Sequence, residues 1–171
     1  MYFKSLPKIP YKNIIDKNNV TLVTNILTRV KLRTPALQNL VLFDTYDVPS
    51  GETPEITAFK HFGSTEYHWI ILMTNDITNI YTQWPLSENA FSNYIIDKYG
   101  DDVDAVHHYE INQTSGDTTK VLQVISTQSG ATPVTNREYE ERLQDERRKI
   151  RLLDRSYLKT FIKEFENLVN A

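Results

Sequence analysis

The sequence predicts an α+β fold, and three stretches of the chain indicate it. Residues 46–84 predict a short strand, a Gly-containing turn and two capped helices. Residues 105–126 show the alternation of a β-hairpin, with a turn signal in the middle. Residues 136–169 contain a charged helical stretch and an amphipathic one. Strands and helices that occur in separate runs are typical of the α+β class.

The composition limits the class of protein before any motif is considered. At 171 residues, with 40% hydrophobic and 24% charged residues, the chain is long enough to bury a core as one domain with extensions. The net charge of −3 indicates no nucleic-acid partner. The absence of cysteine excludes disulfides and thiolate metal sites. With no signal-peptide run and no stretch of roughly 20 apolar residues, we expect no membrane partner.

The N-terminal residues predict an arm followed by a strand. Residues 1–20 are rich in Pro, Lys and Asn, and we interpret them as an extended arm, so deletion of residues 1–12 is expected to leave a folded protein that fails to enter an assembly. The alternative is a frayed terminus. Val30 and Leu32 alternate with basic residues within residues 21–34, which predicts a half-buried strand. The apolar residues of the arm are possible anchors onto another surface: Phe3, Leu6, Ile9 and Tyr11.

The first helix has clear boundary signals. Thr53 suits an N-cap and Pro54 the first helical position, because that position needs no backbone N–H. Gly63 supplies a left-handed stop. The spacing of three apolar residues predicts a shared face, formed by Ile56, Phe59 and Phe62.

Two more helices follow. Ser64 caps the second, and residues 69–73 are apolar on nearly all sides, which indicates burial, with Trp69 in the core. Asn75 ends this helix. Trp84 is interpreted equally well as a core residue or as an exposed anchor for a partner. The third helix begins after Ser87 and ends at Gly100.

The remaining elements lie between residue 105 and the C-terminal end. The hairpin turns at Ser115–Asp117, and residues 127–135 predict a loop rich in Ser, Thr, Gly and Pro. A helix from Asn136 is acidic first and basic last, which matches the helix dipole, although its apolar stripe is thin. Residues 149–153 predict either a strand or more helix. Asp154 or Ser156 then caps a final amphipathic helix.

The sequence contains no recognisable set of catalytic groups. All five glycines stand alone, so they cannot form a phosphate-binding loop. Neither a thiol nucleophile nor a Gly-x-Ser-x-Gly turn is present. We therefore predict no catalytic residues, no cofactor, no small-molecule substrate and no enzyme activity. The alternative is a hydrolase whose site forms only in three dimensions, which a desolvated pair of acids in a cleft would support.

The histidines and acidic residues are predicted to have structural surroundings. His107 and His108 are adjacent on a predicted strand, so we expect their side chains on opposite faces, unable to share an ion. His61 and His68 lie on either side of Gly63 without a third ligand nearby, and we predict no metal site. The carboxylates of residues 136–147 are expected on a solvated face, where a general acid gains no pKa shift.

Residues 46–77 resemble a LysM-type βααβ module. The residues that match its strand, turn and two helices are Tyr46, Gly51, Pro54, Ile56, Ala58, Phe62, Gly63, Trp69, Leu72 and Asn75. A more specific resemblance is to the small baseplate wedge subunit of contractile-tailed bacteriophages, which is the baseplate wedge protein 53 family. It is carried by residues 62–76, by the Trp-Pro-Leu at 84–86 and by the third helix. Residues 148–153 and the closing helix also fit that family.

This resemblance implies a structural subunit of the tail baseplate in the virion, made in the host cytoplasm. Its partners would be the helical core-bundle proteins of the wedge, the sheath-initiating subunit and neighbouring wedges. The implied organisation is an arm and strand at residues 1–42, a LysM-like module with an extra helix at 43–100, and a hairpin with C-terminal helices at 101–171. Candidate partner-binding residues are Phe3, Leu6, Tyr11, Trp84, Tyr139, Phe161 and Phe165.

Peptidoglycan binding by the LysM-like module is the alternative function. LysM modules that bind glycan usually end in a second strand that lines the sugar groove. Residues 78–85 stand at that point of this chain and lead directly into another helix, which argues against sugar binding.

Overall fold

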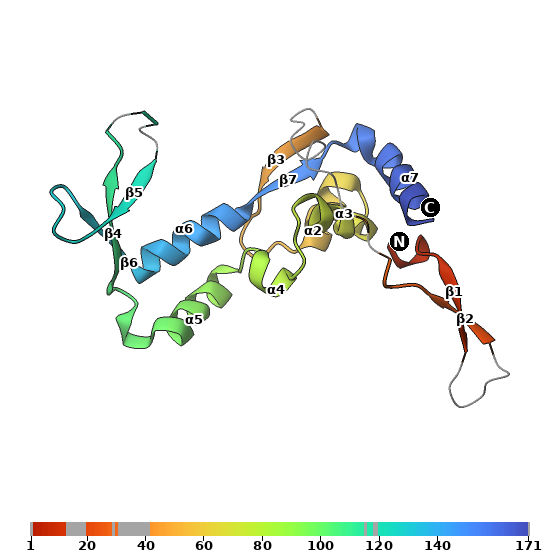
Figure 1. Ribbon diagram of the computed structural model, residues 1–171, viewed down its shortest axis with the longest axis horizontal. Coiled ribbons are helices and arrows are strands. Elements are labelled where there is room, and N and C mark those ends of the chain that lie inside the picture. Colours follow the sequence, from red (N-terminus) through yellow and green to blue (C-terminus); the bar gives the residue numbers. More distant parts are fainter. Residues whose placement is uncertain are drawn as a thin grey trace. The chain divides into compact units, whose positions relative to one another are not determined.

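The computed structural model describes residues 2–12, 20–28, 30, 42–114, 116–117 and 120–170, and it confirms the α+β class. Contacts divide the chain into two compact units (Figure 1). The first contains residues 1–48, 52–83 and 150–171, and the second contains residues 49–51 and 84–149. These boundaries differ from the division at residues 42 and 100, because a strand near the C-terminal end pairs with one near residue 45.

The first unit is built around a β–α–α–β arrangement. Strand β3 pairs with β7 in a two-stranded sheet, and the Asp154 N–H donates to the Leu42 carbonyl (3.0 Å) at its end (Figure 1). The strand alternative for residues 149–153 is therefore the correct one. The elements of this unit are β1 (Lys8–Lys12), β2 (Val20–Thr24), β3 (Phe43–Asp47), α2 (Pro54–Phe62), α3 (His68–Thr74), α4 (Ile80–Gln83), β7 (Lys149–Leu153) and α7 (Leu158–Val169).

Helix α2 begins and ends as predicted, but it buries a different face. The Thr53 hydroxyl accepts a hydrogen bond from the Ile56 N–H, and Gly63 closes the helix at φ 82° with its N–H on the Phe59 carbonyl (2.9 Å). The face predicted to be apolar is largely outside, with Ile56 44% and Phe59 60% exposed. The buried residues are Pro54, Thr57 and Ala58. The helix is therefore oriented by small residues and by the Thr57 hydroxyl, which donates to Glu52 (2.8 Å).

Helix α3 is buried as predicted and is fastened to the closing strand. Ser64 caps a short 3-10 turn at Thr65–Tyr67, which leads into α3. Trp69, Ile70 and Ile71 are all buried. At the helix end, the Asn75 side-chain amide donates to the Arg151 carbonyl (2.8 Å), and its carbonyl accepts from the Arg151 N–H (2.8 Å). This two-way bond joins α3 to β7.

The core of the first unit includes residues from both ends of the chain. Its buried members are Leu6, Trp69, Ile70, Leu153, Phe165 and Val169. Tyr2 packs against Trp69 and Phe165, with ring centroids 5.4 Å apart in each pair. The expectation that the arm is separable from the fold is therefore wrong, because its first residues complete this core.

Beyond Leu6 the arm forms a hairpin. Strand β1 pairs with β2 in an antiparallel register that places Ile9 opposite Val23 and Pro10 opposite Leu22. All ten residues of the two strands are exposed. Of the strand predicted over residues 21–34, this hairpin contains only the first four residues. Leu32 lies outside the described residues, and Val30 packs beside the core.

The second unit consists of two helices and a three-stranded sheet with the order β5–β4–β6. Its elements are α5 (Glu88–Tyr99), β4 (Val106–Asn112), β5 (Val121–Val124), β6 (Thr132–Thr135) and α6 (Asn136–Arg148). The hairpin of β4 and β5 is confirmed, with Asn112 opposite Val121. Helix α5 starts after Ser87, whose hydroxyl accepts from the Ala90 N–H, and ends at Gly100, both as predicted.

The loop predicted over residues 127–135 contains a strand instead. Strand β6 pairs with β4, and it buries Val134 between the exposed Pro133 and the half-buried Thr135. So short a strand with a single apolar residue gives little periodic signal. Helix α6 begins at Asn136 as predicted. Thr135 and Glu138 form a reciprocal capping box there, which the sequence reading did not include.

Candidate interaction surfaces

The candidate partner-binding residues differ widely in exposure. Phe3 and Tyr11 are exposed, and Tyr139 and Phe161 are half-buried. Leu6, Trp84 and Phe165 are buried within this chain, so the structure gives them a core role and corrects their assignment to a partner. The sequence could not separate a core role from a partner-binding role for these residues, because the spacing of apolar residues does not show whether their face is covered by the same chain or by a partner.

The residues of the LysM-like assignment take the following places. Three of them are buried: Pro54, Ala58 and Trp69. Four are half-buried, namely Tyr46, Phe62, Leu72 and Asn75, and Ile56 is exposed. The two glycines, Gly51 and Gly63, adopt positive φ in turns. Tyr46 has a clear reason for its position, because its hydroxyl donates to the buried Glu52 (2.9 Å). Lys60 and Thr57 also donate to this carboxylate, and together with Tyr46 they keep the pKa of Glu52 low although burial raises it.

Exposed apolar side chains lie on both faces of the β1–β2 hairpin and just after β2, and we call them together the hairpin surface. Its residues are Ile9, Tyr11, Val20, Leu22, Val23, Ile26 and Leu27. A hairpin of two strands is only marginally stable in water unless another surface packs against it. A concentration of exposed apolar residues on one segment commonly marks a protein interface. The hairpin surface is therefore the strongest candidate for a docking site in the first unit.

A smaller apolar surface lies on α2, where Ile56 and Phe59 project one helical turn apart. We call this pair the α2 surface. The sequence predicted that these residues share an apolar face, and such a stripe suits a helix that docks on a partner. The sequence thus identified the apolar stripe, but not whether it faces the core or the outside of the unit.

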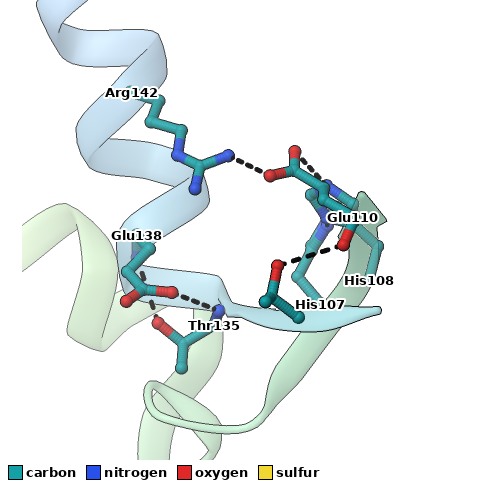
Figure 2. Close-up of polar contacts among 7 residues, drawn as sticks. His107, His108, Glu110, Thr135, Glu138 and Arg142 are labelled. Atoms are coloured by element: carbon teal, nitrogen blue, oxygen red, sulfur yellow. Dashed lines mark hydrogen bonds and ion pairs between the residues drawn. The ribbon is translucent and has the colours of Figure 1, made fainter. Parts of the chain in front are cut away.

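A polar cluster in the second unit joins strand β4 to helix α6 around Glu110 (Figure 2). Arg142 reaches from α6 and donates to Glu110 Oε2 (2.6 Å). His108 Nε2 lies 2.9 Å from Glu110 Oε1. The hydrogen bond from Arg142, together with the weaker one from His108, keeps the pKa of Glu110 below its ordinary value although burial raises it.

His107 and His108 do not point to opposite faces, so the expectation for them is wrong. Their Nδ1 atoms are 2.8 Å apart, and the His107 ring stacks on Tyr139 of α6 with centroids 4.0 Å apart. The pairing of β4 with β6 is irregular between Val106 and His108, and such an irregularity breaks the alternation of side chains. If His108 is neutral and donates from Nε2 to Glu110, its Nδ1 accepts and His107 must donate.

Helix α6 carries a buried carboxylate, Glu140, where a solvated face was expected. Glu140 is 1% exposed, and its Oε1 accepts from Lys98 Nζ (2.6 Å) and the Tyr99 hydroxyl (2.9 Å). Burial raises the pKa of Glu140, but the bonds from Lys98 and Tyr99 outweigh it and hold the pKa below the ordinary value. This pairing fastens α5 to α6, which explains how a helix with a thin apolar stripe packs.

We expect the two members of this pair to respond unequally to mutation. Lys98→Met strands a buried carboxylate and should lower the free energy of unfolding by about 2 kcal/mol at pH 7. Glu140→Gln should cost about 1 kcal/mol, because Lys98 is 44% exposed and can turn to water. Urea unfolding followed by circular dichroism measures both. Equal losses would contradict the burial argument.

The pH dependence of the same pair follows from its low carboxyl pKa. Because the pKa of Glu140 is lower in the folded state, its contribution is full above the ordinary Glu pKa and is lost as the pH falls through the folded value. The deficit of Lys98→Met should therefore shrink when unfolding is measured at pH 4 instead of pH 7. A constant deficit would show that the lost interaction is not ionic.

Two other kinds of site are absent from the described part of the chain. No group of three or more His, Cys, Asp or Glu residues there is arranged to hold a metal ion. None of the described helices has the length and apolar character needed to cross a bilayer. The acids that are buried, Glu52 and Glu140, each pair with a lysine and a tyrosine inside the fold.

Comparison with known families identifies the class of protein. The family model described as base plate wedge protein 53 matches residues 1–127, which is 127 of the 171 residues. The match includes the hairpin surface, the α2 surface and helix α5, and it stops short of β6, α6, β7 and α7. A search of curated proteins finds no match to the chain. The chain belongs to the base plate wedge protein 53 family, whose members are structural proteins of the phage tail baseplate.

Proposed function

We propose that this protein joins subunits of the baseplate wedge, and neighbouring wedges, through protein–protein contacts. The observation that carries the proposal is the hairpin surface, with five exposed apolar residues on the two strands and two more just after β2. Family membership implies a place among other baseplate components. An exposed apolar hairpin in such a protein gains stability when a partner covers it.

The partners that we propose are the helical core-bundle proteins of the wedge and the sheath-initiating subunit. Two surfaces on different elements of the first unit suit contacts with more than one subunit. The hairpin surface is extended and two-stranded, whereas the α2 surface is a single helical stripe. The location that follows is the tail baseplate of the virion.

We also propose that the β3–α2–α3–β7 arrangement is a LysM-like module with a large insertion. The support is the order of its elements, the pairing of β3 with β7 and the Asn75 bond from the second helix to the closing strand. Residues 84–148 lie between that helix and that strand, which is why no closing strand follows the second helix in the sequence. The segment after α3 instead forms the short helix α4.

The LysM-like arrangement keeps peptidoglycan binding as a second candidate, and one pair of measurements separates the two. The purified chain, mixed with the other purified wedge subunits of its phage, should elute with them as one complex in size-exclusion chromatography. The same chain should stay in the supernatant when purified cell wall is pelleted. Co-sedimentation with cell wall, together with no wedge complex, would overturn the proposal in favour of glycan binding.

A further inference from the structure

The two edges of the β1–β2 hairpin are not equivalent. Within the described residues its sheet contains only these two strands, so each strand has one edge with no strand beside it. An open edge presents backbone N–H and C=O groups that can pair with a strand from another chain. The register shows which residues present those groups.

Backbone groups of every second residue point away from the partner strand. The Asn25 N–H donates to the Pro7 carbonyl (2.8 Å), one step before the Lys8–Thr24 pair. Hydrogen-bonded and non-hydrogen-bonded pairs alternate along an antiparallel ladder. The Lys8–Thr24, Pro10–Leu22 and Lys12–Val20 pairs are therefore the ones that direct their backbone groups outward.

This alternation blocks one edge and leaves the other open. At the centre of the β1 edge the outward position is Pro10, which has no N–H to donate. Lysines flank it at positions 8 and 12, and proline with lysine is a common protection against edge pairing. The β2 edge instead presents complete N–H and C=O pairs at Val20, Leu22 and Thr24. Only β2 can accept an uninterrupted third strand.

The charge of the hairpin indicates the chemistry of that strand. Residues 2–12 and 20–28 contain three lysines, Lys4, Lys8 and Lys12, and no acidic residue. All three are exposed. Residues opposite each other share a face, so Lys8 and Lys12 lie on the face that carries Leu22, while Ile9 and Val23 form an apolar face behind it. A strand beside β2 would need apolar residues on one face and acidic ones on the other.

We propose that the edge of β2 accepts an extended, acidic segment of another baseplate subunit as a third strand. The inference rests on the proposed function, because it names the mode of one contact in the wedge. A second copy of this chain fits poorly, since its hairpin is equally basic and the lysines would repel. Main-chain hydrogen bonds would provide affinity, and alternate side chains would provide specificity.

Hydrogen exchange on the wild-type chain tests the proposal without any substitution. The sample is the chain alone and the chain within the complex formed with the other purified wedge subunits. The amides of Val20, Leu22 and Thr24 should exchange at least about tenfold more slowly in the complex, whereas those of Lys8 and Lys12 should change little. If the chain enters the complex but β2 exchanges as before, the inference fails and the proposed function stands. If no complex forms, the proposed function itself fails.

A matched pair of variants tests the edge directly. Leu22→Pro removes the central outward N–H of β2 and leaves the pairing with β1 in place, while Leu22→Ala shortens the same side chain and keeps the N–H. Binding to the wedge complex should weaken at least about tenfold for Leu22→Pro relative to Leu22→Ala. Equal binding by the two variants would overturn the proposal.

A second pair of variants tests the role of the lysine charges. Lys8→Glu with Lys12→Glu should weaken binding more than Lys8→Gln with Lys12→Gln, and the difference should shrink in high salt. Cross-linking from position 24 should then join the chain to an acidic segment of another subunit. A cross-link to a second copy of the chain, or to a segment without acidic residues, would contradict the assigned partner.

Discussion

Replacing Trp69 by alanine is expected to lower the free energy of unfolding by about 3–5 kcal/mol and to abolish the tertiary structure of the first unit. Trp69 stands between Phe165, 4.7 Å away between ring centroids, and Phe161 and Tyr2, at 6.1 Å and 5.4 Å. Its removal opens a cavity where α3, α7 and the N-terminal residues meet. Urea unfolding, followed by near-ultraviolet circular dichroism, measures the loss.

Two control variants separate packing from other causes. Trp69→Phe keeps an aromatic ring and removes an indole N–H that has no partner among the described residues, so it should cost less than half as much. Phe59→Ala removes a ring that is largely exposed and should change stability by less than about 0.5 kcal/mol. If Phe59→Ala destabilises the isolated chain as much as Trp69→Ala does, the assignment of core and surface is wrong.

Replacing Asn75 by alanine is expected to cost about 2–3 kcal/mol. Its side chain bonds both the N–H and the C=O of Arg151 and also caps α3 through the Ile71 carbonyl (2.9 Å). Without it, the middle of β7 loses its link to the second helix. Amide exchange across residues 149–153 should therefore become faster even where the chain remains folded.

Asn79→Ala is the matched control for this change. Within the part of the chain that the structure describes, the Asn79 side chain accepts only from the Tyr81 N–H (3.0 Å) in an exposed turn, so its loss should cost about 1 kcal/mol or less and leave β7 unaffected. If Asn75→Ala were no worse than Asn79→Ala, the closing strand would not depend on the second helix. The proposal of a single β–α–α–β module would then lose its main support.

The features that the sequence predicted well are local ones. Thr53, Ser87 and Gly63 act within a few residues of themselves, so their roles as caps and stops follow from the residue type and its neighbours. The burial of residues 69–71 followed in the same way from a run that is apolar on nearly all sides. Both kinds of signal are complete within one helix.

The features that sequence reading missed depend on distant parts of the chain. The pairing of β3 with β7 joins residues about 100 positions apart, and no spacing pattern encodes such a partner. Glu140 looked solvated because its helix is charged throughout, and only the position of Lys98 shows it to be buried. The α2 stripe was visible, but a stripe that faces a partner has the same spacing as one that faces a core.

The interaction surfaces were predicted only in part, because their exposure also depends on contacts with distant parts of the chain. Phe3 and Tyr11 were singled out as arm residues and are exposed, while Leu6 of the same arm is in the core. The full hairpin surface could not be predicted, because residues 21–27 were interpreted as part of a half-buried strand and residue 20 as the end of the arm. Its assignment depends on the pairing of β1 with β2, which makes the two segments one hairpin.

Electron microscopy of particles from a phage with a stop codon early in this gene tests most directly whether the protein joins wedges. We expect separate wedges to accumulate without closed baseplates, and expression of the wild-type chain from a plasmid should restore closure. Complete baseplates in cells that lack the chain would contradict the account.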